Sequence, residues 1–71
     1  MAFRLTGLPP VRDYPRVTVS PEEEGMLLVF AGAAGERRLD APWRYLEGDR
    51  EGIELRLLAD LQRRGYEVLR P

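Results

Sequence analysis

The chain has 71 residues, and its net charge is close to zero because twelve acidic residues face eleven basic ones. It contains no cysteine and no histidine, and every basic residue is arginine, which excludes disulfides, thiolate metal sites and the usual catalytic bases and nucleophiles. We therefore expect one small domain over residues 1–71 with no catalytic site, cofactor or metal. A domain of this size buries only about 60% of its unfolded surface, so dimerisation would add useful stability.

The composition also indicates the setting in which the protein works. Asparagine is absent and glutamine occurs once, a depletion typical of thermophile proteins, while GC-rich coding explains the arginine bias. The first residues lead into no long apolar segment, and the apolar run 26–34 is too short to cross a bilayer. We expect a cytoplasmic protein from a thermophilic bacterium, without a membrane segment.

The N-terminal part of the chain predicts two strands. Phe3–Leu5 is expected to form a short first strand, and the prolines and glycine within residues 6–15 predict a loop. Arg16–Ser20 alternates valine with polar residues, which is typical of a strand that buries one face.

The residues that follow resemble a helix start, with a serine, a proline and then acidic residues at 20–23. Gly25 comes too soon afterwards for a full helix. We expect one helical turn or a tight loop joining two strands. The alternative is a helix over residues 21–31, which would be apolar on every side after the glycine.

Met26–Ala31 is the most apolar segment and predicts a strand buried on both faces. Only one long helix is available to cover one of these faces. The other face needs a partner, for which a second copy of the chain is the obvious candidate. Alternatively, the proline-rich loop and the segment around Trp43 fold over it. The expected interface residues of this strand are Met26, Leu28 and Phe30.

The middle of the chain predicts a hairpin. Gly32–Gly35 is expected to be its turn rather than a phosphate-binding loop, since a strand and not a helix follows. Glu36–Leu39 is expected to be the return strand, close to an edge of the sheet. Asp40 is expected to cap a short helical turn over Pro42–Leu46.

The clearest element is a helix over Asp49–Arg64. Asp49 is a good N-cap, and Gly65 suits the left-handed position just past the C-terminus. The apolar stripe of this helix comprises Ile53, Leu57, Leu58 and Leu61. A last strand over residues 66–70 follows at once and is expected to lie beneath the helix. The chain thus predicts an α+β fold: a small antiparallel sheet of about four strands with this helix on one face.

Three further apolar or aromatic side chains are candidates for contacts with a partner. Leu55 lies outside the helix stripe, which suggests a second contact, although single exposed leucines are common. Trp43 and Tyr45 are expected to be core or interface anchors, as these residue types often are. Alternatively, they stack nucleic-acid bases beside arginines. The expected phosphate contacts are then Arg37, Arg38, Arg44 and Arg50.

These observations support three functions in order of preference. The first is a small interaction or assembly module, homodimeric or part of a larger complex, without chemistry of its own. The second is a nucleic-acid or nucleotide binder, which is less favoured because the net charge is slightly negative. The third is a carboxylate-dependent enzyme, but the acidic residues lie at helix starts and on solvent faces, where capping and solubility explain them.

Overall fold

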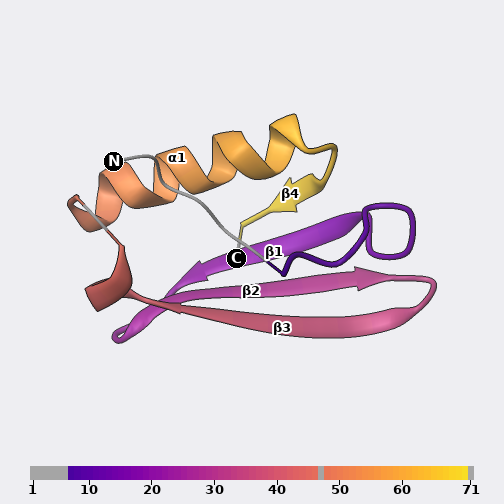
Figure 1. Cartoon of the computed structure of the whole chain (residues 1–71), viewed down its shortest axis with the longest axis horizontal. Coiled ribbons are helices and arrows are strands. Elements are labelled where there is room, and N and C mark those ends of the chain that lie inside the picture. The colour runs from indigo at the N-terminus through magenta and orange to yellow at the C-terminus, as the bar shows by residue number, and fades with distance from the viewer. Residues whose placement is uncertain (1–6, 47, 71) are drawn as a thin grey trace.

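The computed structural model describes residues 7–46 and 48–70, which form one sheet and one long helix (Figure 1). The four strands lie in the order β3-β2-β1-β4. The elements in chain order are β1 (Arg16–Pro21), β2 (Gly25–Gly32), β3 (Gly35–Pro42), the 3-10 helix η1 (Trp43–Tyr45), α1 (Arg50–Arg63) and β4 (Glu67–Leu69). The predicted α+β fold with one main helix and a last strand is confirmed, while the expected strand over Phe3–Leu5 lies outside the described residues.

The sheet is mixed rather than purely antiparallel. Strands β1, β2 and β3 form an antiparallel meander, but β4 pairs with β1 in parallel. The reason is the number of reversals between them: β3 runs in the direction of β1, α1 returns the other way, and the strand after it must run with β1 again (Figure 1).

A tight loop joins β1 to β2, as one of the two interpretations of residues 20–25 predicted. The amide of Glu22 donates to the carbonyl of Gly25 at 2.7 Å, and the pairing of the two strands continues up to this loop. The alternative helix over 21–31 is therefore wrong. Gly25 also allows a close approach of β3, because a Cβ there would lie 2.4 Å from the carbonyl oxygen of Ala41.

Strand β3 is longer than expected and continues to Pro42. Asp40 pairs with Leu27 inside the sheet, and no side chain caps η1, so the predicted capping role of Asp40 is wrong. The short helical turn itself is confirmed. The end of β3 continues to pair with β2, which satisfies the backbone groups of residues 40–42. The helical turn therefore begins three residues after Asp40.

The core lies between α1 and one face of the sheet. Strand alternation places every second residue of β1 and β2 on this face, and the helix supplies its stripe. The fully buried side chains are Val17, Val19, Met26, Leu28, Phe30, Ile53, Leu57 and Leu61. Burying each such side chain stabilises the fold by roughly 1.5–3 kcal/mol relative to its exposure. Leu8, Val11 and Tyr14 of the N-terminal segment pack against the same core.

Both ends of α1 have the predicted caps. The carboxylate of Asp49 accepts a hydrogen bond from the amide of Gly52 at 3.3 Å. At the other end Gly65 has φ of 103°, a conformation that other residues enter only at a cost. The amides of Gly65 and Tyr66 donate to the carbonyls of Gln62 and Leu61, which gives a Schellman motif. This motif turns the chain directly into β4.

Candidate interaction surface

One face of the sheet packs under α1, whereas the opposite face belongs to no part of the core. The strand pairings place these outward residues together on the opposite face: Arg16, Thr18, Ser20, Leu27, Val29, Ala31, Glu36, Arg38, Asp40, Glu67 and Leu69. We name this surface the open face. Each of these residues is at least partly exposed, and none contributes to the hydrophobic cluster beneath the helix.

The open face has an apolar centre between a hydroxyl side and a charged side. Val29 on β2 pairs with Thr18 on β1, and Leu27 pairs with Ser20. Leu69, which is 41% exposed, extends the apolar surface next to Thr18 on β4. An apolar centre with a polar rim is the usual anatomy of a protein interface.

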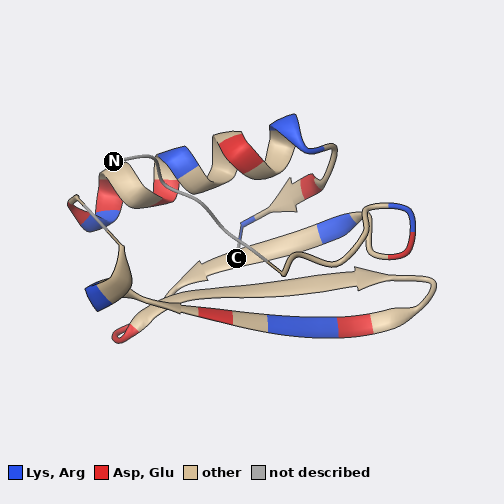
Figure 2. Cartoon of the chain, in the orientation of Figure 1, with Lys and Arg blue, Asp and Glu red and all other residues tan. Residues whose placement is uncertain are grey.

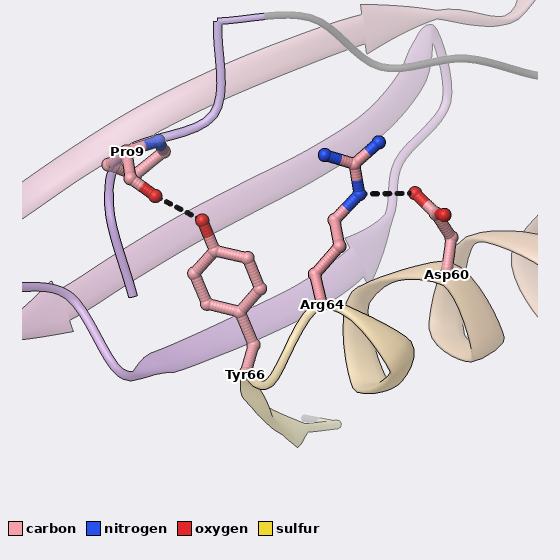
Figure 3. A network of polar contacts seen from close by, with 4 residues as sticks. All are labelled: Pro9, Asp60, Arg64 and Tyr66. Atoms are coloured by element: carbon pink, nitrogen blue, oxygen red, sulfur yellow. Dashed lines mark hydrogen bonds and ion pairs between the residues drawn. The ribbon is translucent and has the colours of Figure 1, made fainter. Parts of the chain in front are cut away.

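The charged side is the outward row of β3, where the signs alternate. Figure 2 shows the charged residues of β3 in red and blue. The strand pairings place Glu36, Arg38 and Asp40 on the same face of this edge strand. Among residues 7–46 and 48–70, none of these three makes an ion pair. Two ion pairs lie on the helix and β4 side of the molecule: Arg64 with Asp60 and Arg70 with Glu54, each at 2.9 Å (Figure 3 shows the first).

The predicted interface residues of β2 lie on the other side of the sheet. Met26, Leu28 and Phe30 are buried under α1, with at most 1% of each exposed, and a partner cannot reach them in the folded chain. The residues of β2 that face outward are the intervening ones, Leu27 and Val29. The central strand is thus apolar on both faces, as predicted, and only one of them is covered by the helix.

Trp43 is an internal anchor of the fold. Its indole nitrogen donates to the carbonyl of Glu22 at 2.9 Å, and its amide donates to the carbonyl of Glu24 at 3.1 Å. The guanidinium of Arg50 lies 4.9 Å from the centre of the indole ring and also donates to the carbonyl of Glu23. Together these contacts fasten the β1–β2 loop to the segment that starts α1.

Tyr45 and Leu55 are exposed, at 73% and 60%, but neither belongs to the open face. Tyr45 follows β3 on η1, where the guanidinium of Arg44 lies 4.9 Å from its ring centre. Leu55 lies on the surface of α1 away from the buried stripe. The sequence indicated that Leu55 lies outside the helix stripe, whereas Tyr45 was expected to be a core or interface anchor and is not part of the core. The structure brings neither of them together with the apolar centre of the sheet.

The four arginines predicted to contact nucleic acid do not all gather on one surface: Arg38 and Arg44 line one cleft together with acidic residues, and Arg37 lies on the other face of β3. Arg37 and Arg38 are neighbours in a strand, so their side chains point to opposite faces. The guanidinium of Arg44 lies over the ring of Tyr45, and the guanidinium of Arg50 lies over the ring of Trp43. Figure 2 shows acidic residues beside the basic ones on α1, on β3 and in the loop that precedes β1, whereas nucleic-acid binders carry a contiguous basic surface.

An open cleft of about 820 Å³ adjoins the open face at the end of β3. It lies between the β1–β2 loop, with its three glutamates, and the segment around Trp43 and Arg44. Leu27, Arg38 and Asp40 line both the cleft and the open face, so the two form one continuous surface.

Within the described part of the chain, no group of three metal-ligating side chains could hold an ion. Nor does that part contain a helix that is long and apolar enough to cross a membrane. Comparison of the chain with protein-family models, with curated proteins and with solved structures finds no match.

Proposed function

We propose that the protein is a small interaction module that binds a protein partner through the open face and has no chemistry of its own. The observation that carries this proposal is that α1 covers only one of the two apolar faces of the central strand β2. Leu28 and Phe30 are buried beneath α1, while Leu27 and Val29, equally apolar, face outward on the same strand.

The physical argument is the limited burial available to a chain of this size. Each 100 Å² of apolar surface that a partner removes from water contributes about 2.5 kcal/mol before the entropic cost of association. A domain with one helix covers only one face of its sheet, so the second face is the largest source of further burial. The composition supports the absence of chemistry, because histidine, cysteine and lysine are all missing.

The proposal can be tested with two variants that place the same side chain on different surfaces. Val29→Lys puts a charge at the centre of the open face, and Leu55→Lys puts one on the exposed side of α1. Both positions are partly or largely exposed, so both variants should fold, which circular dichroism checks.

Affinity capture from the native lysate is the measurement, with each variant used as bait beside the unchanged protein. We expect Leu55→Lys to retain the same bound chains as the unchanged protein, including untagged copies of this chain, and Val29→Lys to lose them. If Val29→Lys retained them and Leu55→Lys did not, the binding surface would lie on the helix instead.

A further inference from the structure

The geometry points to a second copy of this chain as the partner of the open face, packed face to face about a twofold axis. This inference rests on the proposed function and adds to it the identity of the partner and the register of contact. It follows from the way the side chains of the open face are arranged in rows across the strands.

Two neighbouring rows of the open face carry complementary groups. The strand pairings place Arg38, Val29 and Thr18 side by side in one row. The next row, two residues further along each strand, contains Asp40, Leu27 and Ser20. Position by position, the two rows therefore offer a cation and an anion, two apolar side chains, and two hydroxyl groups.

A twofold axis between these rows brings each row onto the other row of the second copy. Arg38 then meets Asp40 of the other copy, Val29 meets Leu27, and Thr18 meets Ser20, and symmetry makes each contact twice. Sheets packed face to face keep their strands within about 30° of each other, so contact along the rows is maintained near the centre.

Symmetry also disfavours the arrangement centred on Arg38. An axis through the row of Arg38 would place this arginine against itself and Glu36 against Asp40. Like charges facing each other across an interface are strongly unfavourable, and charge complementarity of this kind sets register and partner choice. Since none of these three charged residues has an ion-pair partner among the described residues, each is available to a second copy.

The area of the open face is sufficient for a weak dimer. At about 3.3 Å per residue and about 4.8 Å between strands, the eight residues each of β2 and β3, the six of β1 and the three of β4 give a face of roughly 400 Å² per copy. The total of about 800 Å² lies below the range of standard interfaces and in the range of weak, transient ones. The dimer should therefore form reversibly and depend on protein concentration.

Charge exchange between positions 38 and 40, followed by sedimentation equilibrium, tests this inference. Arg38→Glu and Asp40→Arg should each weaken dimerisation by about tenfold or more, because each places like charges together twice. An equimolar mixture of these two variants should form a heterodimer, since every opposed pair is then of opposite sign. The double variant R38E/D40R should regain the homodimer for the same reason.

Arg37→Glu is the matched control, because it makes the same change one residue away on the other face of β3. It should dimerise like the unchanged protein. A mass that stays at 8.1 kDa for the unchanged protein up to millimolar concentration would overturn the inference, as would equal effects of Arg37→Glu and Arg38→Glu. A double variant that remains monomeric would overturn the register.

These outcomes separate the inference from the proposed function. If the unchanged protein is monomeric but Val29→Lys still loses a captured protein, the open face serves a different partner and only the inference fails. If the unchanged protein is monomeric and Val29→Lys retains everything that it retains, both fail.

Discussion

The hydroxyl of Tyr66, just past the C-terminus of α1, donates a hydrogen bond to the carbonyl of Pro9, which precedes it by 57 residues (Figure 3). The ring of Tyr66 also meets Phe30 edge to face, with centroids 5.2 Å apart. These contacts join the N-terminal segment, the central strand and the end of the helix. They close the core at the end opposite Trp43. The contacts of Tyr66 and those of Trp43 both join residues that are far apart in the sequence.

Replacing Tyr66 by phenylalanine should lower the free energy of unfolding by about 1–2 kcal/mol, because the carbonyl of Pro9 loses its donor while the ring packing is kept. Urea denaturation followed by tryptophan fluorescence measures this change. Tyr45→Phe is the control, since its ring is 73% exposed, and it should change the free energy of unfolding by less than about 0.5 kcal/mol. Equal effects of the two variants would contradict the role assigned to Tyr66.

The same tyrosine predicts how stability depends on alkaline pH. Burial raises the pKa of Tyr66 above its ordinary value of 10.0, and the charge of Arg64 acts in the opposite direction with a smaller effect. Above pH 10 the unfolded chain releases this proton while the folded chain still holds it. The unfolded state then binds fewer protons, so stability falls as pH rises from about 10 through the raised pKa of the folded state.

The Tyr66→Phe variant should lack this contribution, and its stability should decline less steeply over the same alkaline range. Thermal denaturation midpoints of the two proteins between pH 8 and pH 11 provide the comparison. Parallel pH profiles would show that Tyr66 ionises as freely in the folded chain as in the unfolded one.

Trp43→Phe should loosen the β1–β2 loop, because the variant cannot donate to the carbonyl of Glu22 and gives Arg50 a smaller ring to lie over. We expect a loss of about 0.5–1.5 kcal/mol, the usual net contribution of one hydrogen bond, because the exposed carbonyl of Glu22 can bond to water instead. Hydrogen exchange at the amide of residue 43, which donates to Glu24, should accelerate more than exchange within α1. Uniform acceleration in the loop and the helix would argue against a local anchoring role.

Truncation of two leucines of α1 should have very different effects. Leu61→Ala should destabilise the protein by about 2–5 kcal/mol, since the side chain is fully buried between the helix and the sheet. Leu55→Ala should change stability by less than about 0.5 kcal/mol, because its side chain is 60% exposed. Denaturant midpoints measure both. A large loss for Leu55→Ala would mean that this leucine has a structural contact on the surface of α1.

The helix and its two ends could be predicted from the sequence because several independent local signals agree there. The spacing of Ile53, Leu57 and Leu61, the cap at Asp49 and the glycine at 65 all indicate the same element. The parallel direction of β4 was not predicted, because it follows from the number of reversals in the whole chain rather than from any property of residues 66–70.

The candidate surface could be predicted only in part. The sequence shows that the central strand is apolar on both faces, and the structure agrees. Which alternate set faces outward depends on where α1 packs, and hydrophobicity alone does not distinguish Leu28 and Phe30 from Leu27 and Val29. The position of the Trp43 side chain could not be predicted from the sequence either, since it depends on a hydrogen bond to a residue 21 positions earlier.

The central claim is that the open face binds a second copy of this chain, and a dilution series of backbone amide NMR spectra tests it most directly. The account predicts that amide shifts of Leu27, Val29 and Thr18 depend on protein concentration, while those of Leu55 and Ala59 on the outer side of α1 do not. Spectra of Val29→Lys should be independent of concentration. Concentration-dependent shifts confined to α1 and Tyr45, or the same shifts in Val29→Lys as in the unchanged protein, would contradict the claim.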